Sequence, residues 1–509
     1  MKYRVFAAVL SGLLLTAAQP PFNASWLAWI ALVPLLAAVK GQSGRIRFNL
    51  GFLTGLAHFT TLIYWVVVVL NTYGGLHVLL SVLVLLAFVT YLALYPGLFA
   101  LLFPVMRKSP YAVFLGAGAW TAVEFARGWL LTGFPWGLLG YSQGTVPRLI
   151  QISDLAGVYG VSFLVAAVNV LVFVLAFDPR PSRKLPTALE GAGLALLIAL
   201  TLFYGTHRMR EVAEDYSRSG TEPVRTAVVQ ANIDQAVKWE PAFQEATLST
   251  YLDLSRGAGR SNPDLLVWPE TALPFFYQDR EGLAQRVRNI AEETGADLLF
   301  GTPAYEGSGR SIRYYNRACL FMPGERSLTF YDKVHLVPFG EYVPLKRFLF
   351  FVERLVPAAG DFASGKRVAP LEGQGYSAGV LICFEAIFPG LTRAQTRRGA
   401  DILVNLTNDA WFGRTGAPYQ HLAMAAFRAV ESRRPMVRAA NTGFSAFVDP
   451  TGRITRKSGL FEEAVLVQDV RPSTLNPTFY TRHGDLFSFF LLAAVFAKLT
   501  GFYFTRSRS

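Results

Sequence analysis

The chain has 509 residues, of which 52% are hydrophobic and 16% charged, and its 48 lysines and arginines against 35 acidic residues give a formal net charge of +13. This balance excludes an intrinsically disordered chain, which needs low hydrophobicity and high charge. It also disfavours an ordinary soluble enzyme, because apolar runs of membrane-spanning length recur in the first half.

The first half of the chain carries the pattern of a membrane-embedded helix bundle. Seven apolar stretches alternate with polar or Pro/Gly-rich segments, at residues 5–18, 26–39, 52–70, 78–105, 111–131, 158–177 and 188–204. An eighth stretch runs over residues 486–504. Since a bilayer requires about 20 apolar residues per helix, we predict about eight transmembrane helices, the first of them short. That first stretch also fits a cleavable signal peptide, because Lys2 and Arg4 precede it and Ala17 and Ala18 end it.

Lysine and arginine residues in the short connecting segments predict the orientation. They precede the first stretch and follow the second, fourth, sixth and eighth: Lys2, Arg4, Lys40, Arg45, Arg47, Arg107, Lys108, Arg180, Arg183, Lys184, Arg506 and Arg508. If each stretch crosses once, all of these lie on one side, which the positive-inside rule makes cytoplasmic. Both termini are then cytoplasmic, and the long segment before the eighth stretch lies outside. Because these basic residues set the orientation in the membrane, they do not indicate nucleic-acid binding, and we expect no nucleic-acid partner.

The segment outside the membrane predicts an α/β domain. Short β-rich runs occur at residues 226–229, 265–268, 297–300, 318–322, 379–383, 401–405, 445–448 and 464–467. Helical patterns lie between some of them, including residues 281–293 before Gly295 and residues 421–432 before Pro435. The predicted parts are a membrane bundle, a linker, the α/β domain, and a last membrane helix with a basic tail, over residues 1–205, 206–221, 222–472 and 473–509.

In three segments of the α/β domain, a reactive side chain lies beside the end of a strand. They run over residues 264–270, 331–344 and 378–385, and they present Glu270, Lys333 and Cys383. Taken singly, each has a plain structural explanation: a carboxylate beside a helix cap, a solvated loop charge and a small core residue. Together they form a consistent catalytic set. A nearby ammonium favours the thiolate, and a carboxylate accepts the thiol proton and later one from an amine or water.

These segments resemble those of the nitrilase superfamily, with its Glu–Lys–Cys triad, and within it the apolipoprotein N-acyltransferase branch. The resemblance is carried by Trp268-Pro269-Glu270, by the long motif from Lys333 to Pro344, and by Asn408-Asp409-Ala410-Trp411-Phe412-Gly413. It covers nearly the whole chain. It implies a polytopic α-helical membrane bundle and an extracytoplasmic, nitrilase-like α-β-β-α sandwich on the periplasmic side of a bacterial inner membrane.

The resemblance also implies acyl transfer in two half-reactions, the last step of bacterial lipoprotein maturation. Cys383 would take an acyl chain from a membrane phospholipid, expected to be phosphatidylethanolamine, as a thioester. The N-terminal amine of a diacylglyceryl-modified apolipoprotein would then take it as an amide. Glu270 would be the general base, and Lys333 and the Phe384 backbone N–H would stabilise the oxyanion. The six histidines form no convincing metal cluster, and no cofactor is expected.

Supporting positions follow from the same resemblance. Glu341 would orient Lys333 or take part in proton transfer, and Glu385 would hold the loop of the nucleophile in place. Trp239 would lie near the lipid pocket. The plain alternatives are a surface charge for Glu341 and a core aromatic for Trp239. The family often has Tyr after the nucleophile, where this chain has Phe384, so only the backbone N–H can act there. His335 is assigned to loop packing rather than to proton transfer.

Other functions share some of these features. A membrane-tethered amidase of the same superfamily would use the same triad with water as acceptor, although the fused bundle and the apolar segment 348–352 favour a lipid donor. That segment is either a membrane-dipping arm or a short core helix. A transporter or lipid receptor would use polar residues within its spans, and the candidates His58, Asn169 and Glu124 form no obvious relay. Cys319 is the one other cysteine, and both a pairing and a free thiol stay open.

Overall fold

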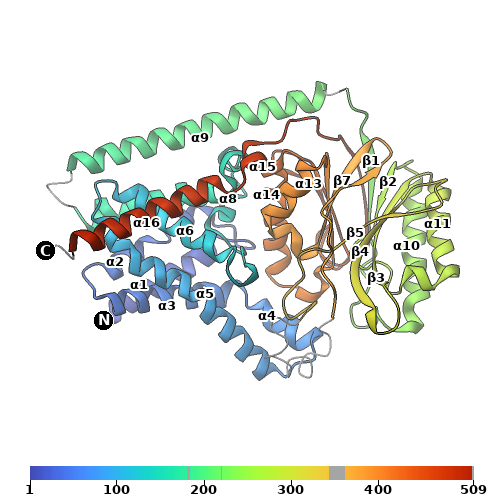
Figure 1. Cartoon of the computed structure of the whole chain (residues 1–509), viewed down its shortest axis with the longest axis horizontal. Helices are drawn as coiled ribbons and strands as arrows, with labels where there is room; N and C mark the ends of the chain where they lie inside the picture. The colour runs from blue at the N-terminus through green and yellow to red at the C-terminus, as the bar shows by residue number, and fades with distance from the viewer. Residues whose placement is uncertain (180–183, 219, 343–360, 507–509) are drawn as a thin grey trace. The chain divides into compact units, whose positions relative to one another are not determined.

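The computed structural model describes residues 1–179, 184–218, 220–342 and 361–506 (Figure 1). The chain divides into two compact units. Unit 1 comprises Met1–Tyr64, Val82–Arg210 and His483–Ser509, and unit 2 comprises Trp65–Ser81 and Glu211–Arg482. Unit 2 therefore includes one short segment from the apolar first half of the chain.

Unit 1 is built of helices. They are α1 (Lys2–Ala17), α2 (Val33–Val39), α3 (Gly44–Leu62), α5 (Val78–Arg107), α6 (Ala112–Arg127), α7 (Pro147–Ile150), α8 (Ser153–Phe177), α16 (Leu486–Arg506) and most of α9 (Lys184–Arg218). Short helical turns η1 (Ser25–Trp29), η3 (Leu130–Thr132) and η4 (Leu139–Gln143) connect some of them. α1 packs on α3, and α6 packs on both α8 and α16. Each predicted apolar stretch contains helix, as expected.

Fewer described helices are long enough to cross a membrane than the eight predicted. Three meet the length and apolarity that a span requires, and they lie in α5, α8 and α9; a fourth is added if α3 and Trp65–Tyr73, bent by 50°, form one span. α1 and α6 have 16 residues each, and α2 has seven. A 16-residue helix extends about 24 Å, short of a hydrocarbon core of about 30 Å. The number eight therefore stays a prediction.

Basic residues from different connecting segments meet at one end of unit 1. The Asp178 carboxylate, which follows α8, lies 3.3 Å from the Lys40 ammonium, which follows α2. It also lies 3.3 Å from the Arg107 guanidinium at the end of α5. The Lys108 ammonium is 4.9 Å from the ring centroid of Phe502, near the end of α16. These contacts agree with the prediction that the basic segments share one side.

Small residues allow α3 and α5 to approach closely. A Cβ atom added to Gly51 would lie 2.3 Å from the carbonyl oxygen of Pro96, and one added to Gly55 would lie 2.6 Å from the Cα of Ala93. Such small-residue contacts between helix backbones are typical of helices that pack in a membrane.

Unit 2 is built on two six-stranded sheets, ordered β12-β1-β2-β3-β4-β5 and β11-β10-β9-β8-β7-β6. The strands are β1 (Val224–Gln230), β2 (Leu265–Val267), β3 (Asp297–Glu306), β4 (Arg313–Phe321), β5 (Thr329–Asp332), β6 (Leu371–Gly373), β7 (Tyr376–Ile382), β8 (Ile402–Thr407), β9 (Met436–Ala440), β10 (Ala446–Val448), β11 (Ile454–Lys457) and β12 (Ala464–Val470). β1, β2 and β3 run parallel, as do β7, β8 and β9, and the flanking strands pair antiparallel.

Helices cover the outer face of each sheet (Figure 1). α10 (Gln244–Gly259) and α11 (Glu281–Thr294) pack on the first sheet, and α13 (Pro389–Arg397) and α14 (Ala417–Ser432) pack on the second. Val267 of β2 and Val404 of β8 share the core between the sheets, whereas Leu266 faces the helices. This alternation is the period of two expected for strands. The predicted α-β-β-α sandwich is confirmed.

The predicted elements of unit 2 all exist, and several more were missed. Every predicted β-rich run coincides with a strand. α11 ends at Thr294, and its C-cap Gly295 has φ 67°, as predicted for a C-cap glycine. α14 ends at Ser432, and its C-cap Arg433 has φ 54°, before Pro435. The missed strands and α-helices are β5, β6, β9, β11, α10, α13 and the short helix α15 (Phe479–His483). All four residues of β11 are exposed, so that strand lacks the apolar pattern that identifies a strand in a sequence.

Some predictions fall on residues that the structure does not describe. These are the apolar segment 348–352, Val343 and Pro344 of the lysine motif, and Arg180, Arg183 and Arg508. They stay predictions.

Candidate active site

The three predicted triad residues follow the ends of three strands. Glu270 comes three residues after β2, Lys333 directly after β5, and Cys383 directly after β7. β2 and β5 belong to the first sheet and β7 to the second. The structure brings these side chains together: the Lys333 ammonium lies 3.5 Å from Oε1 of Glu270, and both charges act on the Cys383 thiol.

The Glu270 carboxylate is buried and held by two hydrogen bonds. Asn316 Nδ2 donates to its Oε1 at 2.8 Å, and the Asn408 backbone N–H donates to its Oε2 at 2.8 Å. The next residue, Thr271, has φ 46°, a strained value for a β-branched side chain. Gly301 lies so close to this turn that a Cβ atom added to it would be 2.5 Å from the Thr271 nitrogen. The carboxylate therefore has a fixed orientation.

The Lys333 ammonium is buried between two carboxylates. It lies 2.9 Å from each oxygen of Glu341 and 3.5 Å from Glu270. Burial alone would lower the pKa of Lys333, but the charges of Glu341 and Glu270 outweigh burial and raise it. Glu341 also accepts hydrogen bonds from Asn316 Nδ2 and from the Val337 N–H, both at 2.9 Å. Lys333 is therefore charged at neutral pH, and Glu341 is its partner rather than a free surface charge.

Cys383 lies in a strained turn between β7 and the short helix η9 (Cys383–Ile387). Its φ is +53°, in the left-handed region that few non-glycine residues occupy. Burial and the charge of Glu270 raise the pKa of the Cys383 thiol, while Lys333 acts in the opposite direction. The ammonium thus favours the thiolate as predicted but does not outweigh the other two effects. The thiol is protonated at rest and needs a base.

Glu385 connects the lysine segment to the turn of the nucleophile. One of its oxygens accepts hydrogen bonds from the Tyr331 hydroxyl at 2.9 Å and from the backbone N–H groups of Val334 and His335 at 2.7 and 3.0 Å. The other accepts from the Ile382 N–H at 2.8 Å, one residue before the nucleophile. Burial raises the pKa of Glu385 to about 7, although these N–H groups lower it. The side chain is completely buried, so it acts through these contacts and not on a substrate.

A second polar network supports the nucleophile and was not predicted. His421 of α14 places Nε2 3.2 Å from the Cys383 carbonyl oxygen and Nδ1 3.0 Å from Asp409. Arg438 donates to the other Asp409 oxygen at 2.7 Å. All these side chains are buried. Burial and Arg438 lower the pKa of His421, although Asp409 acts in the opposite direction. Asp409 belongs to the 408–413 motif, but its spacing gave no sign of a partner in α14.

His335 packs in the loop, as expected, and is neutral. Its ring centroid is 3.8 Å from that of Phe388, and its Nε2 is buried with no hydrogen-bond partner among the described residues. Burial and the charge of Lys333 lower the pKa of His335 from 6.5 to about 4. The unfolded chain protonates this ring near pH 6.5, so its contribution to stability is full above that pH and lost as pH falls through 6.5 toward 4.

We therefore expect His335→Phe to weaken the acid sensitivity of the protein. The phenyl ring keeps the stacking on Phe388 but cannot take up a proton. Wild type should lose up to about 3 kcal/mol that the variant does not lose between pH 6.5 and 4. Thermal midpoints of both proteins in detergent, measured across this pH range, check the prediction. Parallel curves for the two proteins would contradict it.

The remaining predicted positions differ in their surroundings. Trp239 is 44% exposed, in the turn before η6 (Pro241–Phe243), so it is not a core aromatic. The Phe384 ring packs edge-on against Phe388 with centroids 5.1 Å apart. Cys319 is buried in β4, and burial raises the pKa of its thiol to about 12. Both cysteines are free, which resolves the question of a pairing.

Part of the first half of the chain packs against the 408–413 motif within unit 2. The Trp65 indole N–H, in α4 (Trp65–Val68), donates to Gln420 at 3.2 Å, and its ring lies 4.9 Å from that of Phe412. Tyr73, which ends η2 (Val69–Tyr73), contacts Trp411 with centroids 5.8 Å apart. The helix in the predicted span over residues 52–70 therefore breaks near Leu62, and the residues beyond the break make aromatic contacts within the α/β unit.

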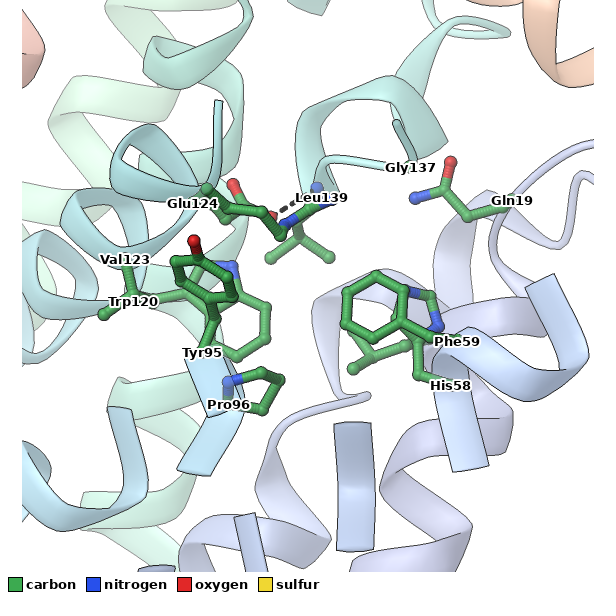
Figure 2. Close-up of a pocket in the computed structure, with 12 residues that line it drawn as sticks. Gln19, His58, Phe59, Tyr95, Pro96, Trp120, Val123, Glu124, Gly137 and Leu139 are labelled. Atoms are coloured by element: carbon green, nitrogen blue, oxygen red, sulfur yellow. Dashed lines mark hydrogen bonds between the residues drawn. The ribbon is translucent and has the colours of Figure 1, made fainter. Parts of the chain in front are cut away.

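Figure 2 shows a pocket inside unit 1, around which His58 and Glu124 both lie. One Glu124 oxygen accepts a hydrogen bond from the Leu139 N–H at 2.7 Å. Asn169 does not line the pocket. It instead bonds the backbone of Ala28 and Leu32, each at 2.8 Å, at the break between η1 and α2. None of the residues that line this pocket carries a thiol. In the described part of the chain, no group of three or more His, Cys, Asp or Glu residues is arranged to hold a metal ion.

Comparisons with known proteins identify the family. A family model described as apolipoprotein N-acyltransferase N-terminal domain matches residues 11–171, and one described as carbon-nitrogen hydrolase matches residues 225–480. An apolipoprotein N-acyltransferase of Geobacter metallireducens is 45% identical over 499 residues, which cover 97% of this chain and 94% of that protein. The chain belongs to the apolipoprotein N-acyltransferase family.

Further members of the apolipoprotein N-acyltransferase family match over similar lengths. The protein from Pseudomonas putida is 36% identical over 89% of this chain and 88% of its own length. Among solved structures, a Nesterenkonia AN1 amidase from the nitrilase superfamily aligns with 52% of this chain and 94% of its own, with 23% identity and a TM-score of 0.40. Because these apolipoprotein N-acyltransferases align with nearly the whole chain, the similarity covers the helical unit as well as the α/β unit.

Proposed function

We propose that this protein transfers an acyl chain from a membrane phospholipid, through a thioester on Cys383, to the N-terminal amine of diacylglyceryl-modified apolipoproteins. The observation that carries the proposal is the convergence of Glu270, Lys333 and Cys383 in a chain of the apolipoprotein N-acyltransferase family. Phosphatidylethanolamine is the proposed donor.

In the first half-reaction, Glu270 takes the proton of the Cys383 thiol as the sulfur attacks the ester carbonyl. The tetrahedral oxyanion is stabilised by the Lys333 ammonium and by the backbone N–H of Phe384, donors of a kind worth about 3–4 kcal/mol. When the intermediate collapses, the ester C–O bond breaks and Glu270 returns its proton to the leaving oxygen. The products are a thioester and a lysophospholipid.

In the second half-reaction, the amine of the lipoprotein attacks the thioester carbonyl. Glu270 takes a proton from the attacking nitrogen, the C–S bond breaks, and the sulfur regains a proton. The products are an amide and the free thiol. An α-amine has a pKa of about 7.7–8.0, so a base is useful here too. Trp239 is proposed to contact the lipid, which its exposure beside the site allows.

We propose that the protein is a multi-pass protein of a bacterial inner membrane, with the α/β unit on the periplasmic side and both termini in the cytoplasm. The contacts of Lys40, Arg107 and Asp178 support this orientation, because they collect basic segments at one end of unit 1. Both lipid substrates would then face the thiol from the outer leaflet.

The test is an assay with phospholipid vesicles and a synthetic diacylated lipopeptide, with mass spectrometry of all products. We expect N-acylated peptide and lysophospholipid in equal amounts. Without the lipopeptide, the intact mass of the protein should increase by one acyl group. Free fatty acid without N-acylated peptide would instead support the water-using amidase. An unmodified protein with no turnover would overturn both enzymatic functions.

A further inference from the structure

A second buried ammonium lies beside the proposed general base. Lys238 is fully buried in the turn at residues 234–240, next to the exposed Trp239. Its ammonium donates to the Thr271 hydroxyl at 2.9 Å and lies 3.5 Å from the carbonyl oxygen of Glu270. Both partners are neutral. Burial lowers the pKa of Lys238 to about 8, and the negative charge of Glu270 acts in the opposite direction.

Glu270 shares the positive charge of Lys333 with other acidic side chains. Lys333 lies closer to Glu341, at 2.9 Å, than to Glu270, at 3.5 Å. It also acts on the carboxyl group of Glu385. Asp409 is paired with Arg438, so that guanidinium is already engaged. The Lys333 ammonium thus interacts with three acidic groups: Glu270, Glu341 and Glu385. The Lys238 ammonium is a second positive charge that interacts with Glu270.

Lys238 also holds a strained turn. Thr271 has φ 46°, and strain in a β-branched residue persists only when its surroundings impose it. The ammonium contacts the residues on both sides of the Glu270–Thr271 peptide bond, and Gly301 also lies against this turn. Its position therefore fixes where the carboxylate points.

We propose that Lys238 is a positioning residue for the general base: its ammonium holds the Glu270–Thr271 turn and places a second positive charge beside the Glu270 side chain. It acts through Glu270 and does not touch the substrate. The inference rests on the proposed function, in which Glu270 takes the thiol proton.

The buried charge lowers stability at neutral pH. Because folding lowers the pKa of Lys238, the cost is full below about pH 8 and disappears as pH rises toward 10.5. Among the described residues, its hydrogen-bond partners are neutral, so its burial costs free energy of folding. Activity and stability should therefore respond differently to its removal.

The test compares Lys238→Met with wild type as full-length, membrane-inserted protein. We expect kcat to fall about 10- to 100-fold, and the acid limb of the pH–rate profile to move to higher pH by about one unit. Removing a positive charge near the base makes the base take up a proton more readily, which gives this direction. Lys238→Gln keeps a hydrogen-bond donor without the charge, so it should move the limb equally and serves if Lys238→Met fails to insert.

Thr271→Val is the matched control. It removes the hydroxyl partner, keeps the β-branched shape at the strained position and leaves the ammonium in place, so its acid limb should stay at the wild-type pH. An unmoved limb in both lysine variants would overturn the inference and assign Lys238 a purely structural role. Full acylation by Cys383→Ala, measured in the same series, would instead overturn the proposed function itself.

Discussion

Cys383→Ala is expected to abolish N-acylation, with a loss of at least about 10⁴-fold, equal to about 5.5 kcal/mol of activation free energy. The thioester pathway needs a sulfur, and no other described side chain near Glu270 and Lys333 offers one. The variant should still fold and insert. Alanine tolerates the strained φ of +53° no worse than cysteine does, and Glu385 and His421 hold the turn through backbone groups of Ile382 and residue 383.

The matched control is Cys319→Ala, which removes the other free thiol. Cys319 lies in β4, buried among the side chains that pack under α10 and α11. Its loss should cost some stability and leave turnover close to wild type. Rates of lipopeptide acylation, thermal midpoints and intact masses after exposure to phospholipid check both variants. An acyl adduct that survives in Cys383→Ala and disappears in Cys319→Ala would reverse the assignment of the nucleophile.

The sandwich fold could be predicted from local patterns because most of its central strands are rich in apolar residues. β7 and β8 are buried at every residue, and such runs are identifiable without tertiary information. Three of the four edge strands, β5, β6 and β11, were missed because they are short and are fixed by pairing with a neighbour. The central strand β9 was missed although it is buried at every residue. The helices of unit 1 were located correctly, but the stretches 26–39 and 111–131 are longer than the helices α2 and α6 within them. Composition does not reveal the break between η1 and α2, which Asn169 stabilises from α8.

The triad could be predicted because Glu270 and Cys383 follow predicted strands and Lys333 begins a long motif. Glu341 and Glu385 were also predicted, but Asn316 and His421 could not be, because their roles depend on pairings between distant segments. Asn316 joins Glu270 and Glu341 through one amide nitrogen, and it comes from the middle of β4. His421 reaches Cys383 from the first turns of α14. The effect of burial on the thiol was also missed, since a sequence shows which charges are present but not how much water surrounds them.

Lys333→Met is expected to lower kcat by about 10³-fold or more, through two separate effects. The first is the loss of the cation that stabilises the oxyanion, which typically costs about 10²- to 10³-fold. The second concerns the base. Without the ammonium, Glu270 and Glu341 share only the Asn316 amide, at 2.8 and 2.9 Å, and repulsion between two buried carboxylates makes one of them take up a proton. The acid limb of the pH–rate profile should therefore move to higher pH.

The double variant Lys333→Met/Glu341→Gln separates the two effects. Glutamine removes one of the two carboxylate charges and keeps most of the shape of Glu341, so the acid limb should return toward the wild-type pH. The rate should stay low, because the oxyanion still lacks its cation. Full pH–rate profiles for wild type, the single variant and the double variant measure both the rate and the position of the acid limb. Recovery of the wild-type rate in the double variant would mean that Lys333 serves only to neutralise Glu341, and the role proposed for its ammonium at the oxyanion would be wrong.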